Sequence, residues 1–166
     1  MSTETIMFTS ADALSLEGRL AIPNGDPPRG GVVICHPHPQ YGGSMSSKLV
    51  PAMQRALVAA GWAALRFNFR GVGRSEGAFA GGDGEVADVL GAIGRVREVV
   101  AEPTAVVGWS FGALVALNAV AHDDGVSRYV GVAPPVRRAL TGRMPLPQIA
   151  ELEGWTARSL IVCGTE

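Results

Sequence analysis

The stretch VVGWSFGALVAL, residues 106–117, indicates the fold because a turn of small residues joins two kinds of element. A β-branched apolar run ends at Gly108, a serine follows at Ser110, and a second apolar run begins after Gly112. This is the G-x-S-x-G pattern between a strand and a helix. The turn is so sharp that Cβ atoms two residues either side of the serine would collide, hence the glycines. We expect the turn to present the Ser110 hydroxyl at the carboxyl edge of a sheet, as a catalytic nucleophile.

The residue after the serine has a predicted role in the same geometry. The N–H of Phe111 lies at the start of the expected helix, where the positive end of the helix dipole favours an anion. We expect this N–H to be one donor of an oxyanion hole. The alternative is a purely structural strand-to-helix turn with an exposed serine.

Strand-like and helix-like segments alternate along the rest of the chain. Strands are expected at 5–9, 15–22, 31–36, 62–69, 104–109, 128–133 and 158–164, and helices at 47–60, 83–100 and 111–122. The apolar positions at helical spacing in the first helix are Leu49, Met53, Ala56, Leu57 and Ala60. The first two strands suit an antiparallel pair, and the later uninterrupted apolar runs suit parallel strands covered on both faces. The pattern predicts a single α/β domain, residues 1–166, with a mostly parallel sheet and helices on both faces.

The composition excludes several classes of protein. With 47% hydrophobic and 17% charged residues and a net charge of −1, the 166-residue chain is neither disordered nor suited to nucleic acid or an anionic membrane. The uncharged stretch 103–121 has the length of a membrane span, but its central glycines and serine favour a strand, a turn and a helix. The first ten residues lack the features of a signal peptide, so we expect a cytoplasmic protein. Cys35 and Cys163 each end an apolar run and are expected to be buried thiols.

The segment HPHPQYGG, residues 36–43, follows an expected strand at the edge where ligands approach an open α/β sheet. Its two histidines have no Cys, His or acidic companions nearby in the sequence, so no metal is expected. Proline has no N–H, which limits backbone donors for an oxyanion to His38, Gln40, Tyr41 and the two glycines. The second oxyanion donor is expected from this segment, as the backbone of His38 or Gln40 or as the Tyr41 hydroxyl.

A glycine-rich loop, RGVGRSEGAFAGG, follows the 62–69 strand. Its glycines mimic a dinucleotide fingerprint, but the loop is too long, and the next strand ends in Gly-Trp-Ser instead of the acid that binds a ribose. No cofactor is therefore expected, and the loop is predicted to form an edge of the site. The residues expected to contact a small-molecule substrate are Gly42, Gly43, Arg70 and Trp109.

Taken together, HPHPQYGG, RFNFRGVGRSEG and GWSFGA resemble the α/β-hydrolase superfamily, in particular small bacterial members near the dienelactone hydrolase and prolyl oligopeptidase branches. The resemblance extends from about residue 15 to the last residue. It implies a Ser-His-acid triad in the chain order serine, acid, histidine, with Ser110 matching the nucleophile and Phe111 an oxyanion donor. In prolyl oligopeptidase-like relatives a tyrosine hydroxyl before a glycine pair is the second donor, and Tyr41 is similar.

The resemblance also implies residues that this sequence does not contain. The family's acid usually follows the strand matched by 158–164 in a G-x-x-D pattern, whereas here the sequence is Gly164, Thr165 and Glu166. We expect the acid, the histidine and the last strand and helix of the fold to lie beyond residue 166. His122 closes the helix that Ser110 opens, roughly 17 Å away at helical rise, which is too far to take the serine's proton.

The sequence therefore predicts an esterase-like serine hydrolase of small ester, amide or thioester substrates, weak or inactive without its triad partners. The alternatives are a catalytically inactive binding protein on the same fold and a fragment without a function of its own. The 158–164 strand would leave an apolar sheet edge, which predicts aggregation, pairing with another copy in a homo-oligomer, or a missing remainder of the sheet. No nucleic acid or membrane partner is expected.

Overall fold

The structure, a computed structural model, describes residues 1–100, 103–137 and 158–164. These residues form a seven-stranded sheet in the order β1-β2-β4-β3-β5-β6-β7. The strands are β1 (Ser2–Thr9), β2 (Ser15–Ile22), β3 (Gly31–Cys35), β4 (Ala63–Phe67), β5 (Thr104–Trp109), β6 (Val126–Val132) and β7 (Ser159–Val162). β1 and β2 form an antiparallel hairpin that joins β4 in antiparallel fashion, and every pair from β4 to β7 is parallel.

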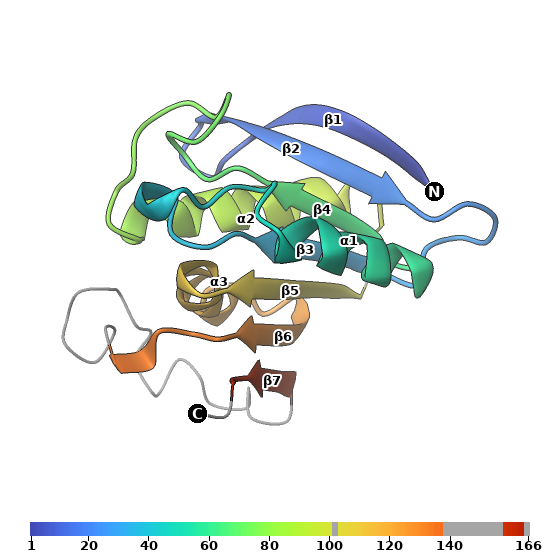
Figure 1. Ribbon diagram of the computed structural model, residues 1–166. Helices are drawn as coiled ribbons and strands as arrows, with labels where there is room; N and C mark the ends of the chain where they lie inside the picture. The colour runs from blue at the N-terminus through green and yellow to red at the C-terminus, as the bar shows by residue number, and fades with distance from the viewer. Residues whose placement is uncertain (101–102, 138–157, 165–166) are drawn as a thin grey trace.

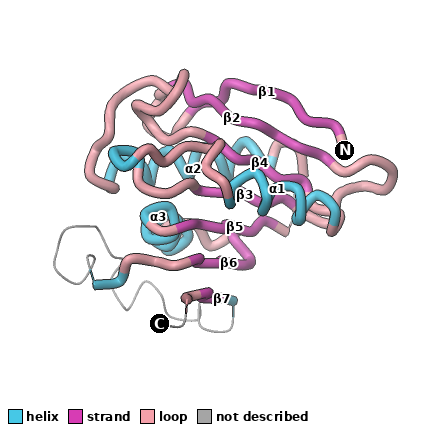
Figure 2. The backbone as a smooth tube through the Cα atoms, in the orientation of Figure 1, coloured by secondary structure: helices cyan, strands magenta, loops and turns pink. Residues whose placement is uncertain are grey.

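Helices cover both faces of the sheet, as predicted. They are α1 (Leu49–Ala59), α2 (Asp83–Arg97) and α3 (Phe111–Ala121). Figures 1 and 2 show α1 on one side of the sheet and α2 with α3 on the other. Side chains of a strand alternate between faces, so Val32 and Ile34 of β3 join the core under α1, whereas Val33 and Cys35 join the larger core under α2 and α3. The α/β fold with a mostly parallel sheet is thus confirmed.

The buried face of α1 does not coincide with its apolar positions at helical spacing. The helix buries Val50, Gln54 and Val58, whereas Leu49 and Ala56, two of those apolar positions, are exposed. Gln54 is the physical reason. Its Nε2 donates to Ala64 O (2.9 Å) and to Arg19 O (2.8 Å) of the sheet. A pattern of apolar residues does not identify a buried amide side chain, because its burial depends on hydrogen bonds to strands elsewhere in the chain.

Several element boundaries also differ from those expected. β1 begins at Ser2 instead of residue 5, α2 ends at Arg97 instead of 100, and β4 is confined to Ala63–Phe67. A short 3-10 helix, Pro39–Tyr41, was not predicted. Of the two cysteines, Cys35 is buried as expected, but Cys163 is exposed because it lies just after β7, the last strand in the sheet order.

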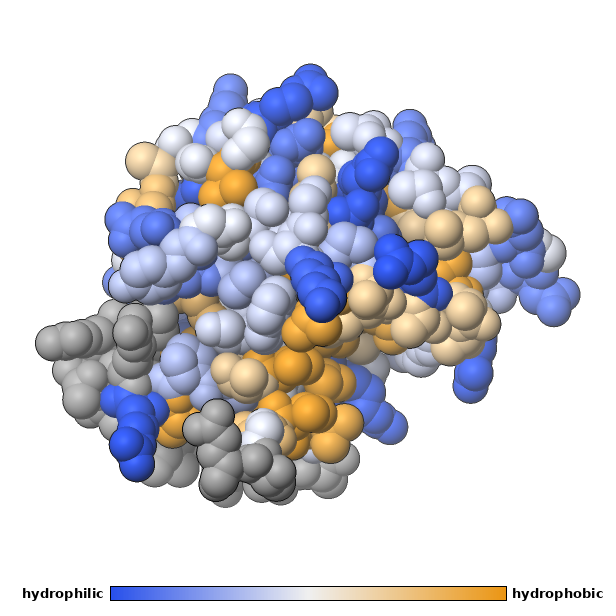
Figure 3. Space-filling model, viewed as in Figure 1, coloured by the Kyte–Doolittle hydropathy of each residue, from blue (hydrophilic) through white to orange (hydrophobic). Residues whose placement is uncertain are grey.

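The outer end of the sheet carries an apolar surface. Figure 3 shows apolar side chains gathered over β5, β6 and β7, on the side of the sheet where α1 lies. In β7, Leu160, Ile161 and Val162 are 57%, 51% and 46% exposed. In the part of the chain that the structure describes, no helix combines the length and the apolar character needed to cross a membrane.

Candidate functional site

The turn between β5 and α3 holds Ser110 in a backbone conformation that residues with a side chain rarely adopt. Its φ is +55° and its ψ is −119°. A Cβ at Gly108 would collide with Gly112 O and lie 2.5 Å from Ala113 N. A Cβ at Gly112 would collide with His36 O and lie 2.7 Å from Cys35 O. The two glycines therefore let α3 start directly against the ends of β3 and β5, with Ser110 at the apex of the turn.

Hydrogen bonds from β6 fix this turn on its other side. Ser110 N–H donates to Val132 O (2.8 Å), the last residue of β6. The buried hydroxyl of Tyr129 donates to Ala113 O (2.7 Å) in the first turn of α3, and burial raises the pKa of this phenol, so it stays a donor. The first N–H groups of a helix have no acceptor within it, and that of Phe111 is the first of α3. The helix start thus presents an N–H and a partial positive charge beside Ser110.

The segment after β3 folds into a tight turn whose amides are mostly engaged. Tyr41 N–H (3.1 Å) and Gly43 N–H (3.0 Å) donate to His38 O, and Gly42 N–H donates to Pro39 O (3.0 Å). Gln40 N–H donates to Nδ1 of His38 (3.2 Å). Of the donors considered from the sequence, the amides of Gln40, Tyr41, Gly42 and Gly43 are thus engaged within the turn itself.

His36 has a structural position instead of a catalytic one. Its ring is fully buried, Nδ1–H donates to Pro37 O (2.6 Å), and Nε2 accepts the N–H of Phe69 (3.1 Å). Burial lowers the pKa of His36 to about 4, so the ring is neutral at neutral pH. His36 therefore joins the end of β3 to the segment after β4 and has no nitrogen left for Ser110.

Four rings meet beside the start of α3. The His38 ring lies 4.7 Å from that of Phe111, 4.9 Å from that of Phe79 and 4.7 Å from that of Tyr41, centroid to centroid. Phe79 and Phe111 are 5.7 Å apart. We call His38, Tyr41, Phe79 and Phe111 the aromatic cluster. It brings the segments after β3, β4 and β5 together next to Ser110.

Arg70, expected to contact substrate, is buried and engaged with carboxylates of the protein itself. Its guanidinium donates to Asp88 Oδ1 through Nε (3.0 Å) and Nη2 (2.7 Å), and Nη2 also reaches both oxygens of Asp12 (2.8 and 2.9 Å). Burial raises the pKa of Asp88, and hydrogen bonds from Arg70 oppose that rise. Arg70 thus ties α2 and the β1–β2 turn to the end of β4, and we remove it from the expected substrate contacts.

The other residues expected at the site lie around the same strand ends. Trp109 is the last residue of β5 and is half-buried, directly before Ser110. Gly42 is exposed with φ of +79°, a conformation that suits glycine, and a Cβ at buried Gly43 would collide with Pro37 O. Both glycines thus shape the turn that carries His38 and Tyr41.

The sequence patterns did not identify two buried residues near the site, Arg66 and Asn68. Arg66 Nη1 donates to Met45 O (2.5 Å), and Asn68 Oδ1 accepts Met45 N–H (2.9 Å). Asn68 also donates to Glu17 Oε2 (2.9 Å), and its carbonyl accepts the Ser75 hydroxyl (2.7 Å). The only available signal was their position, two residues apart at the end of a strand and therefore on one face. They fasten the segments on both sides of the site to β4.

The remaining histidine, His122, lies at the end of α3 that is far from Ser110. His122 caps the far end of α3, where its Nδ1 bonds Asn118 O (2.8 Å). Among the residues that the structure describes, no three His, Cys, Asp or Glu side chains gather as metal ligands would.

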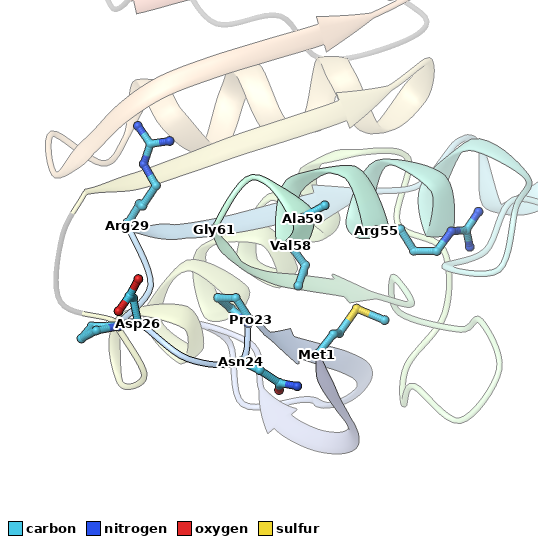
Figure 4. Close-up of a pocket in the computed structure, with 10 residues that line it drawn as sticks. Met1, Pro23, Asn24, Asp26, Arg29, Arg55, Val58, Ala59 and Gly61 are labelled. Carbon is cyan, nitrogen blue, oxygen red and sulfur yellow. The ribbon is translucent and has the colours of Figure 1, made fainter.

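A cavity of about 580 Å³ lies at the opposite edge of the sheet and is separate from Ser110. Its walls come from the segment between β2 and β3 and from the end of α1, including Pro23, Asn24, Val58 and Gly61. Figure 4 shows the side chains of Arg29 and Arg55, which also line it, pointing away from each other. The cavity thus lies at the amino ends of the parallel strands and lacks convergent polar groups, whereas ligands of open α/β sheets bind at the carboxyl ends.

Comparison with known proteins agrees with this geometry. The model of a family described as serine aminopeptidase, S33, matches residues 26–163. An alpha-beta serine hydrolase homologue from Coxiella burnetii is 29% identical, with a TM-score of 0.78 over 99% of this chain and 88% of that one. A serine hydrolase without lid from Xanthomonas campestris is 28% identical, with a TM-score of 0.79 over 98% of this chain and 84% of that one.

A curated relative is also similar over part of its length. An uncharacterized protein of Rickettsia prowazekii is 38% identical over 106 residues, which are 63% of this chain and 44% of that protein. The match thus spans less than half of the curated relative.

Proposed function

The chain belongs to the serine aminopeptidase S33 family of α/β-hydrolases, and we propose that it is a serine hydrolase whose nucleophile is Ser110. The observation that carries the proposal is the backbone of Ser110, with φ of +55° at the apex of a strand-to-helix turn that only glycines at 108 and 112 allow. Such strain is kept where the surrounding structure enforces it, and it places a serine hydroxyl where a substrate can reach it.

The proposed reaction is acyl transfer to the serine followed by hydrolysis. Ser110 Oγ attacks the carbonyl carbon of an ester, amide or thioester while a base takes the hydroxyl proton. The carbonyl oxygen becomes an oxyanion, stabilised by Phe111 N–H and by His38 N–H or the Tyr41 hydroxyl. When the carbonyl re-forms, the bond to the leaving group breaks and the leaving group takes that proton. Water then attacks the acyl-serine in the same way and releases the acid.

The base is assigned to the histidine that the family resemblance implies, oriented by an acid, in the chain order serine, acid, histidine. His36 has both ring nitrogens engaged, and His122 lies at the far end of α3. These two positions argue against a base from either residue. A triad without its histidine retains only the contribution of binding and the oxyanion hole.

The proposed substrates are small. The similar Xanthomonas hydrolase is described as lacking a lid. An equally open site in this protein would favour short acyl groups that bind without being enclosed.

Labelling of the full-length protein with a fluorophosphonate, followed by mass spectrometry, tests the nucleophile, and vinyl butyrate hydrolysis tests turnover. We expect Ser110 to carry the label and Ser110→Ala to lose both labelling and turnover, by at least about 10³-fold. Ser127→Ala is the matched control, because Ser127 is also half-buried but lies at the other end of the sheet, bonded to Thr104 O. Unchanged turnover in Ser110→Ala would remove Ser110 from the reaction.

A further inference from the structure

The aromatic cluster is built from three separate segments that end beside Ser110. His38 comes from the segment after β3, Phe79 from the loop after β4, and Phe111 from the turn after β5. Their centroid separations of 4.7 to 5.7 Å are those of directly packed rings. Because Phe111 follows Ser110 in the chain, the cluster borders the position of the proposed nucleophile.

The exposure of these rings increases outward from Ser110. Phe111 is 1% exposed, His38 and Phe79 are half-buried, and Tyr41 is 74% exposed. The cluster therefore ends in an open aromatic surface instead of being sealed in the core. A large exposed aromatic side chain beside a reactive group marks a surface suited to an apolar ligand.

The cluster is held rigidly from behind. Phe111 packs on Phe69 (5.8 Å) at the edge of the core, and the Gln40 N–H bond to Nδ1 fixes the His38 ring. On the Phe79 side, Glu85 accepts the N–H of Ala80 (2.9 Å) and of Gly82 (2.8 Å). A surface fixed in this way binds without losing much conformational freedom.

Two charged groups that adjoin the Phe79 loop, Arg70 and Glu85, are engaged with the protein itself. Arg70, at its start, bonds Asp88 and Asp12, and the Glu85 carboxylate bonds backbone N–H groups. The cluster thus offers ring faces and edges to a ligand. The ion pair of Arg70 with Asp88 is directed into the protein. This composition favours a neutral, flat substrate group over a charged one.

We propose that the aromatic cluster is the acyl-binding wall of the site and selects substrates whose acyl group carries an aromatic ring, which the ring faces of Tyr41 and Phe79 contact. This inference rests on the proposed function, because an acyl wall needs Ser110 as the nucleophile. Contacts between aromatic rings add to the effect of burying area, so an aromatic acyl group is favoured over a saturated ring of the same size.

The test compares kcat/KM for methyl phenylacetate and methyl cyclohexylacetate in the full-length protein. The two acyl groups have the same carbon skeleton, so their ratio isolates the aromatic contribution. We expect the ratio to favour phenylacetate by about two- to tenfold and to fall to about one in Tyr41→Leu and Phe79→Leu. Tyr41→Phe keeps the ring and should keep the ratio, whatever the hydroxyl contributes to the rate. Trp62→Leu, the same kind of change at the amino end of β4, is the control.

A second readout needs no turnover and separates the two proposals. The affinities of phenylacetate and cyclohexylacetate for Ser110→Ala, measured by NMR titration, should show the same preference for the aromatic compound. Adding Tyr41→Leu to Ser110→Ala should abolish this preference. Because the Tyr41 ring is exposed, its removal does not open the core. A ratio of about one in the parent protein, or a preference that survives both leucine variants, overturns the aromatic wall. Turnover that persists in Ser110→Ala instead overturns the proposed function, and the titration still decides the ring preference.

Discussion

At Gly112 only a hydrogen atom fits between the start of α3 and the end of β3. An added Cβ would meet the backbone carbonyls of His36 and Cys35, which are held in the sheet and cannot move aside. We expect Gly112→Ala to push the helix start outward, lowering the free energy of unfolding by about 1–3 kcal/mol and displacing Ser110 and the Phe111 N–H. Urea unfolding measures the first effect, and a fall in kcat with little change in KM would report the second.

Gly94, in the interior of α2, is the matched control for that substitution. Apart from the neighbouring backbone of its own helix, no described atom lies within 4 Å of a Cβ placed there. Gly94→Ala should therefore raise the free energy of unfolding by about 0.5–1 kcal/mol, because alanine restricts the unfolded chain and suits a helix. If Gly94→Ala and Gly112→Ala changed the free energy of unfolding in the same direction, close contact at Gly112 would not be the cause of the change there.

The buried ring of His36 makes stability depend on pH in a defined window. Its folded pKa is about 4, against about 6.5 in an unfolded chain, so the unfolded state binds more protons between these values. The contribution is fully present above pH 6.5 and is lost as the pH falls toward 4, by up to about 3 kcal/mol. Urea unfolding at a series of pH values in this window measures the slope.

The variant His36→Gln separates His36 from other titrating groups. It should have a lower stability at neutral pH but a shallower loss of stability between pH 6.5 and 4. Parallel slopes in the parent and in His36→Gln would show that His36 is not the group responsible.

At the scale of elements, the ion pair between Arg70 and Asp88 joins α2 to the segment after β4. The Asp88 side chain is fully buried and that of Arg70 is 8% exposed. Asp88→Asn would leave the guanidinium in the protein interior with one carboxylate fewer, and we expect a loss of about 3–5 kcal/mol in the free energy of unfolding. Thermal and urea unfolding of the variant measure this loss.

The exposed pair between Arg95 and Glu98 of the same region provides the comparison. Its carboxylate is 69% exposed, so Glu98→Gln should change stability by no more than about 0.5 kcal/mol. The double variant Arg70→Met, Asp88→Leu removes both charges, so it should recover part of the loss. The recovery is incomplete because Asp88 Oδ2 also accepts the buried N–H of Arg70 (2.9 Å), and leucine removes that acceptor. A double variant less stable than Asp88→Asn would contradict a cost from the unpaired guanidinium.

The same elements show where sequence patterns succeed and where they do not. The strands were predicted because each is a local apolar run, and the turn at Ser110 because its glycines lie at fixed spacing. The apolar spacing of α1 did not reveal that Gln54 is buried, because its partners Ala64 and Arg19 are distant in the chain. In the same way, Asp88 of α2 faces inward to Arg70, a partner that lies outside the helix. Partners of buried polar groups are set by tertiary structure, which a local pattern does not contain.

For the whole molecule, the layer arrangement followed from alternating strands and helices, and the order of the strands came from the structure alone. The site shows the same division. The position of Ser110 was predictable, whereas the assembly of the aromatic cluster from three segments depends on β3 lying between β4 and β5. The association of copies through β7 stays a prediction, and its exposed Leu160 and Ile161 give the residues at which to examine it.

The sheet order also has a consequence for biosynthesis. The β1–β2 hairpin leaves the ribosome before its neighbour in the sheet, β4, which is the next strand but one in the chain. About 40 residues separate the end of β2 from the start of β4, so at 5–20 residues per second the hairpin waits roughly 2–8 s for its partner. During that interval Leu16 and Leu20, buried in the finished protein, have no sheet to cover them. The nascent hairpin therefore exposes these apolar side chains before Ser110 and α3 have been translated.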